Sequence, residues 1–213
     1  MLFARGVILV EGDAERFLIP AFAQQMKTPL DHLGISVCSV SGTNFQPYVK
    51  LLAGLGIPFA VVTDWDPVEG SKPLGYNRAL KLVETIEAIA TGTEPAALLK
   101  ELKALDDYDD FSDACDEHGV FTNIKTLEVD LFNDDNFTES IVDTLLEGPF
   151  GKDRKALIDE WKKDPTKLDT EQYLAMIEDI GKGRFAQRLV DRISDVEPPG
   201  YISRAIKFVA GRV

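Results

Sequence analysis

The sequence predicts an α/β protein: a parallel-core sheet flanked by helices, with a helical insertion. Three apolar segments have the pattern of strands, at 7–10, 35–42 and 58–66. Helical patterns separate them, at 14–25 and 45–55. Parallel strands need a crossover between them, and helices usually supply it. The order strand, helix, strand, helix, strand therefore predicts a parallel sheet.

The first strand and its turn have a simple local explanation. VILV at 7–10 is continuously apolar, as expected for a strand buried on both faces. Gly12 makes the turn after it, and Asp13 can cap the helix expected from Ala14 to Gln25. The third segment, PFAVVTDWD at 58–66, also runs from apolar residues into acids.

The alternation of strands and helices stops after the third strand. A helical pattern runs from about Arg78 to His118, and its acidic end, DDYDDFSDACDE at 106–117, is expected to be a solvated, partly mobile segment. Strand character returns over 119–132, and helices fill most of the remaining chain, including 137–180. We therefore expect a core of residues 1–77 and 119–213 and a helical insertion of residues 78–118.

Composition excludes several classes of protein. The net charge of −13 argues against a simple nucleic-acid clamp, which would be basic. It does not exclude a nucleic-acid enzyme whose acids bind divalent metal. Two cysteines and two histidines make a zinc site a poor expectation and favour reduced thiols in a cytoplasmic protein. No apolar run approaches 18 residues, so we expect no membrane span.

Acids gather where the predicted strands end. They form three pairs: Glu11 with Glu15, Asp64 with Asp66, and Glu128 with Asp130. The carboxyl ends of parallel strands meet in one crevice, which the first two pairs should reach from neighbouring strands. If the strands continue, the residues of the second and third pairs point the same way, because side chains alternate with period 2. Converging carboxylates repel each other, and divalent cations bound by oxygen ligands relieve this repulsion.

Each pair alone also has a purely structural interpretation. An acidic pair after a strand is often a solvated turn, and acids at a helix start complement the helix dipole. Glu128 and Asp130 are equally compatible with the solvent face of an edge strand. The conjunction of three pairs, two of them preceded by an apolar strand, favours a metal site with Mg²⁺, Mn²⁺ or Ca²⁺.

The order and spacing of VEGDAE and VVTDWD resemble a Toprim domain, the metal-binding module of topoisomerases, bacterial primases and some nucleases. TLEVDL and GKGRFA at 181–186 make the chain most similar to nucleases of the overcoming-lysogenization-defect (OLD) family. The resemblance covers most of the chain. It implies a Toprim-like fold and a metal-dependent DNA endonuclease that cleaves phosphodiester bonds by a two-metal mechanism, with Mg²⁺ or Mn²⁺.

The resemblance also implies roles for particular residues. Glu11 and Lys182 would act in catalysis. Apart from the resemblance, Arg184 and Arg188 are spaced four residues apart on one helical face and join Lys182 as candidates for contact with DNA, although helices often carry such charges only for solubility. Without the resemblance, Lys182 would be taken for a solvated lysine in a turn. The two metal ions would be held by Glu11, Glu15, Asp64, Asp66, Glu128 and Asp130, with the assignment of each acid to one ion left open.

One departure from the family concerns ATP. OLD proteins resemble a fusion of an ABC-type ATPase with the nuclease, and the sequence contains no GxxxxGK[ST] motif. We therefore expect the chain to correspond to the C-terminal nuclease half. An N-terminal ABC-type ATPase domain is expected in the full-length protein.

Two other functions stay open at this point. DWDPV fits the DxDx[TV] motif of haloacid-dehalogenase-type phosphatases, with Asp64 as nucleophile and Asp66 as acid/base. That family places the motif on its first strand, and Glu11 and Glu15 would then have no role. The second alternative is a non-catalytic nucleic-acid-binding module that retains the acids without the activity.

Overall fold

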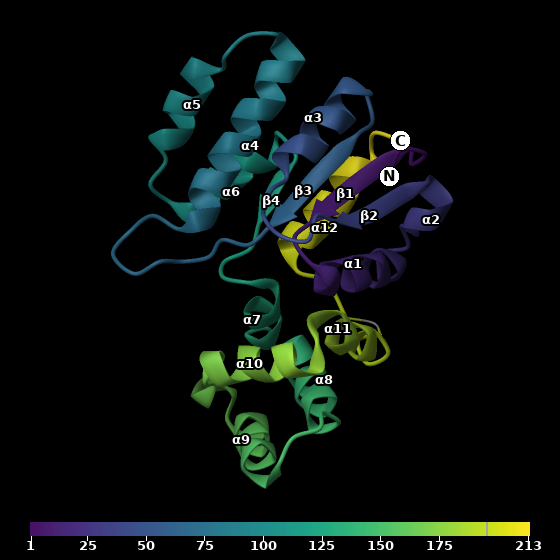
Figure 1. Ribbon diagram of the computed structural model, residues 1–213, viewed down its shortest axis with the longest axis vertical. Coiled ribbons are helices and arrows are strands. Elements are labelled where there is room, and N and C mark those ends of the chain that lie inside the picture. Colours follow the sequence, from purple (N-terminus) through teal and green to yellow (C-terminus); the bar gives the residue numbers. More distant parts are fainter. Residues whose placement is uncertain (195) are drawn as a thin grey trace.

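The computed structural model describes residues 1–194 and 196–213 and has a four-stranded parallel sheet at its centre (Figure 1). The strands are β1 (Gly6–Val10), β2 (Ile35–Ser39), β3 (Phe59–Thr63) and β4 (Val120–Thr122), in the order β2-β1-β3-β4. β1 pairs in parallel with both β2 and β3, and β3 pairs with β4. The predicted α/β class is confirmed, and the strands that end at the first two acidic pairs are neighbours.

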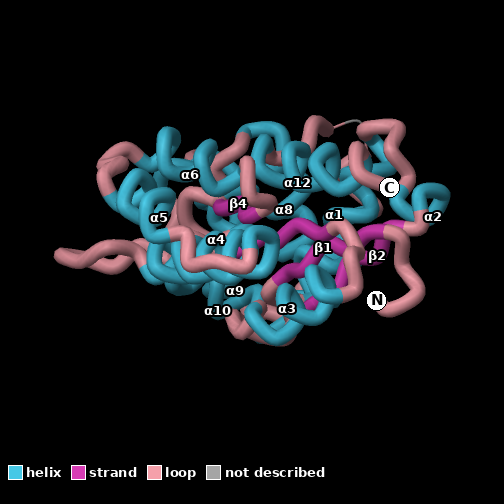
Figure 2. Tube along the Cα trace, turned by 90° about the horizontal axis from the view of Figure 1, so that it is seen from above, coloured by secondary structure: helices cyan, strands magenta, loops and turns pink. Residues whose placement is uncertain are grey.

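Helices cover both faces of the sheet, as Figure 2 shows. Ile8 and Val10 of β1 face one apolar core, with α1 (Asp13–Gln25) and α12 (Gly200–Ala210). Val7 and Leu9 face the other core. That second core contains residues of α3 (Gln46–Gly54), α4 (Leu74–Thr91) and α6 (Tyr108–Asp116). Every residue of β1 is buried, which explains its continuous apolar run.

The segment between β3 and β4 is helical. It contains α4, α5 (Ala96–Lys103) and α6, and the short α2 (Leu30–Leu33) precedes β2. Most of the acidic run forms α6, in agreement with the helical pattern expected up to His118, and Asp109, Asp110 and Asp113 are exposed, as expected of a solvated segment. Asp107 caps this helix by accepting hydrogen bonds from the N–H groups of Asp109 and Asp110. The division into a core and an insertion at residue 78 stays a prediction.

A group of helices lies beyond the carboxyl ends of the strands, in the lower part of Figure 1. The group packs around buried aromatic side chains such as Trp161 and Tyr173, and α11 packs against α1. This arrangement places α7 and α11 beside the acids that follow β1 and β3. The members are α7 (Leu127–Phe132), α8 (Asp135–Leu146), α9 (Lys152–Lys163), the 3₁₀ helix η1 (Pro165–Lys167), α10 (Thr170–Ile180) and α11 (Lys182–Val190).

The strand expected over 119–132 is wrong beyond Thr122. β4 covers three residues, and Leu127–Phe132 forms helix α7. Five of the six residues of α7 are buried, so apolar residues occur on nearly every side of this helix. A helix that is buried all round has no polar stripe to reveal its 3.6-residue period, and its sequence resembles a strand.

Two smaller features complete the comparison with the sequence. Gly12, rather than Asp13, is the N-cap of α1, and Asp13 lies in the first turn of the helix. None of the helices in the described part of the chain is long and apolar enough to cross a membrane.

Candidate metal and nucleic-acid site

The first two acidic pairs meet at the carboxyl ends of β1 and β3. Glu11 directly follows β1, and Asp64 directly follows β3. The two strands are paired, and the backbone N–H of Asp64 donates to Glu11 Oε1 at 3.0 Å. Thr63, the last residue of β3, donates its hydroxyl to the same oxygen. The parallel sheet therefore brings together acids that are about fifty residues apart in the chain.

An arginine that the sequence did not single out joins two of these acids. Arg78 Nη1 lies 2.6 Å from Glu11 Oε1, and Arg78 Nη2 lies 2.9 Å from Asp66 Oδ2. Nη1 also donates to the Thr63 hydroxyl at 2.7 Å and to the Asp64 carbonyl at 3.0 Å. Arg78 comes from the second turn of α4 and resembles any charged helix residue in the sequence. The only indication of such a cation in the sequence is general: acids that are shielded from water need a positively charged or hydrogen-bonding partner.

Asp64 is half-buried at the end of β3. Its Oδ1 accepts hydrogen bonds from the side-chain amide of Asn123, just after β4, and from the N–H of Leu127, at the start of α7. Burial, together with the charges of Glu15 and Glu11, raises the pKa of Asp64 to about 8, against a smaller lowering by Asn123. Asn123 also accepts from the N–H of Trp65 at 2.8 Å, so it fixes both residues.

Glu15 is a buried acid of the site. It lies in the first turn of α1 and is 7% exposed. Burial raises its pKa to about 7, and the charges of Glu128 and Glu11 act in the same direction. A backbone hydrogen bond and Lys182 oppose this shift. Glu15 and Asp64 thus hold their protons near neutral pH, because burial and the neighbouring carboxylates disfavour their charged forms.

Glu128 and Lys182 form an ion pair at the edge of this cluster. Glu128 is 3% exposed, and its Oε1 lies 3.2 Å from Lys182 Nζ. Partial burial lowers the pKa of Lys182, but Glu128, Glu178 and Asp64 outweigh it, and the net pKa lies above the ordinary lysine value. Lys182 is 41% exposed and stays charged at neutral pH. It opens α11 after Gly181, whose φ of +91° suits glycine.

Asp130 lies apart from its expected partner Glu128. Helix residues two positions apart point about 200° away from each other, so the shared direction expected from a strand is wrong. Asp130 Oδ2 accepts from the N–H groups of Ile124 at 2.7 Å and Lys125 at 3.2 Å. Its contacts hold the loop between β4 and α7.

Asp64 and Asp66 also differ from the strand geometry expected for them. β3 ends at Thr63, and Asp66 has a φ of +49°, in the left-handed region. The N–H groups of Trp65 and Asp66 donate to the carbonyl of Lys125, each at 3.2 Å. The two aspartates reach the site through a turn, and Arg78 reaches both of them, at the Asp64 carbonyl and the Asp66 carboxylate.

The donor set fits a hard divalent cation in its chemistry. Carboxylate oxygen atoms are the ligands that Mg²⁺ and Mn²⁺ prefer. Burial and the charges of neighbouring acids raise the pKa values of Glu15 and Asp64, and a bound cation would offset both effects. Within residues 1–194 and 196–213, no three His, Cys, Asp or Glu side chains lie close enough together to hold one ion. The acids lie near one another, but they do not form a complete coordination shell for one ion.

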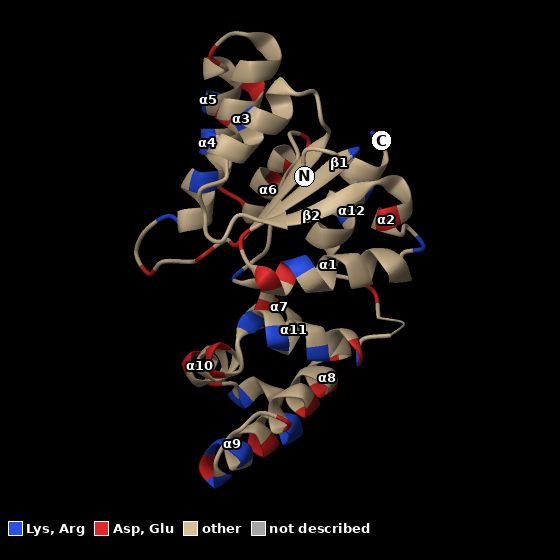
Figure 3. Ribbon diagram, turned by 45° about the vertical axis from the view of Figure 1, so that its right-hand side comes forward, with Lys and Arg blue, Asp and Glu red and all other residues tan. Residues whose placement is uncertain are grey.

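The basic candidates differ in their positions. Lys182 and Arg184 line a cavity of about 770 Å³ together with Glu11 and Asp13. Figure 3 shows the basic start of α11 beside the acidic start of α1. Arg184 is exposed, whereas Arg188 is half-buried. The cavity therefore joins the acids to Lys182 and Arg184.

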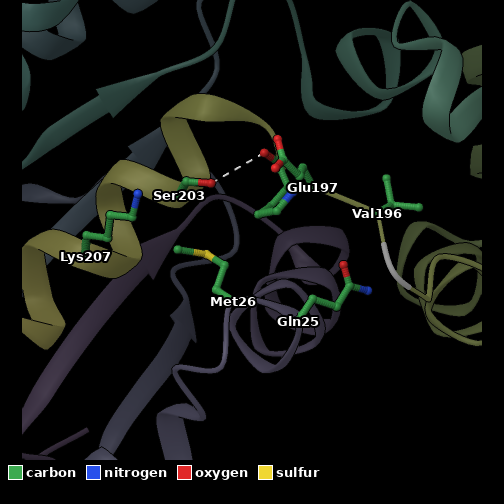
Figure 4. Close-up of a pocket in the computed structure, with 7 residues that line it drawn as sticks. Gln25, Met26, Val196, Glu197, Ser203 and Lys207 are labelled. Atoms are coloured by element: carbon green, nitrogen blue, oxygen red, sulfur yellow. Dashed lines mark hydrogen bonds between the residues drawn. The ribbon is translucent and has the colours of Figure 1, made fainter.

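A second cavity, of about 520 Å³, lies between the end of α1 and α12 (Figure 4). Its lining includes Gln25, Met26 and Ser203, with Glu197 and Lys207 as charged residues. None of the acids that follow β1 and β3 lines it. It has no part in the site described above.

The parallel sheet with acids after its first and third strands defines a Toprim domain, and comparisons with known proteins agree. The family model described as "Overcoming lysogenization defect protein-like, TOPRIM domain" matches residues 2–66. The chain is similar to the C-terminal region of the Burkholderia pseudomallei OLD protein, at 43% identity over 98% of both chains with a TM-score of 0.80. The corresponding region of the Xanthomonas campestris pv. campestris OLD protein is 40% identical, over 99% of this chain and 96% of that one, with a TM-score of 0.83.

The chain belongs to the OLD family. It is also 35% identical over 88 residues to Endonuclease GajA of Bacillus cereus (strain VD045). That match covers 38% of this chain and 15% of the length of GajA. These similarities support a nuclease function, and Toprim nucleases generally depend on divalent metal ions. They give no support to the phosphatase alternative built on DWDPV.

Proposed function

We propose that the chain is a DNA endonuclease domain that cleaves phosphodiester bonds with two divalent ions, Mg²⁺ or Mn²⁺. The observation that carries the proposal is the cluster of Glu11, Glu15, Asp64 and Glu128 beside Lys182 at the carboxyl ends of β1 and β3. The full-length protein would add an N-terminal ABC-type ATPase domain and would act in the cytoplasm. Any dependence on ATP would come from that domain.

Electrostatics supports cation binding at this cluster. Glu11, Glu15 and Glu128 each raise the pKa of Asp64, so the four carboxylates lie within electrostatic reach of one another. Arg78 contacts Glu11 and Lys182 contacts Glu128, which leaves Glu15 and Asp64 without a cationic partner in the described residues. A divalent ion adds the missing charge without adding bulk.

The proposed roles follow from these positions. Glu11, Glu15, Asp64, Asp66 and Glu128 would hold the ions, which supply a polarised phosphate and an activated water when bound. Asp130 was expected among the ligands, but its contacts with the backbone of the β4–α7 loop support a structural role instead.

Lys182 would act on the substrate. Its ammonium group stays charged, is partly exposed and lines the same cavity as Glu11. A charged donor held beside the acids stabilises negative charge that develops on a phosphate in the transition state. Arg184, at the same cavity, is the better placed of the two arginines for contact with the DNA backbone.

A cleavage assay tests the proposal. Supercoiled and linear DNA would be incubated with the chain in Mg²⁺, Mn²⁺, Ca²⁺ or EDTA, beside Glu11→Gln and Lys182→Met. We expect nicking or degradation with Mg²⁺ or Mn²⁺ and none in EDTA. The two variants should lose more than about 100-fold in rate, since they remove a proposed ligand and a transition-state contact. Asp31→Asn, an exposed acid on α2, is the matched control and should cut like the wild type.

The other outcomes separate the alternatives. Equal cutting by all four proteins would indicate a contaminating nuclease. DNA binding without cleavage in any metal would support the non-catalytic nucleic-acid-binding module.

A further inference from the structure

Arg78 is the residue of the site that the proposed chemistry has not yet used. Its side chain is 13% exposed, and it lies between the half-buried side chains of Glu11 and Asp66. It comes from α4, the first helix of the segment between β3 and β4. A guanidinium in contact with two proposed metal ligands either competes with the metal for these carboxylates or orients them for metal binding.

The hydrogen bonds favour the second possibility, that Arg78 orients the two carboxylates. The guanidinium contacts one oxygen of each acid, Glu11 Oε1 and Asp66 Oδ2. In the described part of the chain, Glu11 Oε2 and Asp66 Oδ1 accept no hydrogen bond from protein groups. Each carboxylate is thus oriented through one oxygen and presents the other. Carboxylates that bind metals are commonly held in this way by a second set of hydrogen bonds.

Arg78 is itself fixed by other contacts. Its Nη1 donates to the Thr63 hydroxyl and to the Asp64 carbonyl as well as to Glu11. A residue that only neutralised charge in the absence of metal would need none of these additional bonds. The planar fork of arginine satisfies several acceptors in fixed directions, which an ammonium group does not do.

The start of α4 is also docked on the backbone of the Asp64–Asp66 turn. Leu74 N–H donates to the Asp66 carbonyl at 3.1 Å, and Gly75 N–H donates to the Trp65 carbonyl at 2.9 Å. A Cβ on Gly75 would lie 2.7 Å from Trp65 Cα, so only glycine permits this close approach. The helix that supplies Arg78 is therefore held in register with the turn that carries Asp66.

Trp65 strengthens the same connection. Its ring contacts Tyr76 of α4 and Phe111 of α6, with ring centroids 6.3 Å and 5.7 Å away. Tyr76 and Phe111 stack with centroids 4.6 Å apart. The residue between the two aspartates is packed against the second core, and it anchors the turn to α4 and α6.

We infer that Arg78 is a positioning residue of the metal site, which holds Glu11 and Asp66 so that one carboxylate oxygen of each is free for a divalent cation. This inference rests on the proposed function. It gives the helices between β3 and β4 a role at the site, through Arg78 and the docked start of α4.

Metal binding by the whole chain tests this role without any cleavage assay. Calorimetric titration with MnCl₂ would compare the wild type with Arg78→Gln and Arg78→Lys. We expect both variants to bind Mn²⁺ about 10–100-fold more weakly, the usual effect of losing a group that orients metal ligands. Arg212→Gln is the control, because Arg212 follows α12 and lies over the Phe208 ring, and it should bind like the wild type.

Three results would count against one idea or the other. Tighter binding by Arg78→Gln would show that the guanidinium competes with the metal, and wild-type binding by Arg78→Lys would show that only its charge matters. Either result overturns the inference and leaves the proposed function standing. No Mn²⁺ binding by the wild type would overturn the proposed function and the inference with it. If Arg78→Gln fails to fold, Arg78→Lys, which keeps the charge, decides alone.

Discussion

The two halves of the acidic site are balanced in different ways. Glu11 and Asp66 share the guanidinium of Arg78, and Glu11 also accepts from Thr63 and the backbone. Among the described residues, no cation forms an ion pair with Glu15 or Asp64, and burial raises their pKa values to about 7 and 8. In the balanced half, Glu11 and Asp66, a cation of the protein compensates the carboxylate charge. In the stressed half, Glu15 and Asp64, burial and neighbouring acids destabilise the charged forms. Stress of this kind at a strand-end crevice is typical of a functional site.

Replacement of one carboxylate in each half should give the largest difference between the two halves. Asp64→Asn should lower metal-dependent cleavage by more than about 100-fold, because it removes a proposed ligand. The same change should raise the melting temperature in EDTA at pH 8.5 by several degrees, at about 2–4 °C per kcal/mol for a chain of this size. The new amide can still accept from the N–H of Leu127, and the buried charge is gone.

Asp66→Asn is the counterpart in the balanced half. It weakens the pairing of Asp66 with Arg78, whose Nη2 lies 2.9 Å away, so it should lower the melting temperature in EDTA. Asp66 is 30% exposed, and the loss should be modest. Equal shifts in the same direction for Asp64→Asn and Asp66→Asn would break the distinction between the two halves.

The pH dependence of stability is the next largest effect. The folded-state pKa values of Glu15 and Asp64 lie above their ordinary values of 4.5 and 3.8, so the folded chain holds protons that the unfolded chain has released. Stability in EDTA should therefore fall as the pH rises from about 5 to 8 and level off near 9, by about 1 kcal/mol or more per pH unit.

Urea unfolding at several pH values measures this slope. Added Mg²⁺ or Mn²⁺ should flatten it, since bound cations stabilise the ionised carboxylates. Asp64→Asn should reduce the slope, because it removes one of the carboxyl groups whose pKa is raised. A metal-free stability that is constant or rises over pH 6–8 would contradict the account of the stressed half.

The sequence predicted the parts of the site that depend on strand order. Glu11 and Asp64 directly follow buried strands, and parallel pairing brings such residues to one edge whatever the details of the loops. The motifs GKGRFA and TLEVDL also pointed to Lys182 and Glu128, which form an ion pair. Arg78 and Asn123 escaped notice, because a single arginine in a helix or an asparagine after a strand has no pattern of its own.

The conformation of 126–132 could not be predicted from apolar alternation. Leu127, Val129 and Leu131 alternate with other residues as in a strand, yet all three are buried in a helix surrounded by other helices. Burial on every side depends on the long-range packing of α8 and α10, which the local sequence does not encode. Glu128 therefore lies beside Lys182 although the expected strand geometry was wrong, and Asp130, included on that geometry and on the family resemblance, lies apart from it.

Helix α7 offers the finest test of the comparison, since its two acids belong to different environments. Glu128 faces Lys182 and raises the pKa of Asp64 and Glu15, whereas Asp130 holds the N–H groups of Ile124 and Lys125. Glu128→Gln should lower cleavage and Mn²⁺ affinity clearly. Asp130→Asn should keep cleavage within about threefold of the wild type and change the free energy of unfolding by less than about 1 kcal/mol, because the amide oxygen can still accept from both N–H groups.

Both variants replace a carboxylate with an amide on the same helix, so each is the control for the other. Cleavage rate and urea unfolding would be measured on both proteins. A strong loss of cleavage in a well-folded Asp130→Asn protein would return Asp130 to the ligand set and would require α7 to turn when metal binds. A loss confined to Glu128→Gln would mean that the site ends at the face of α7 that touches Lys182. In that case the helical form of 127–132, which separates the two acids, also decides which of them can take part in the reaction.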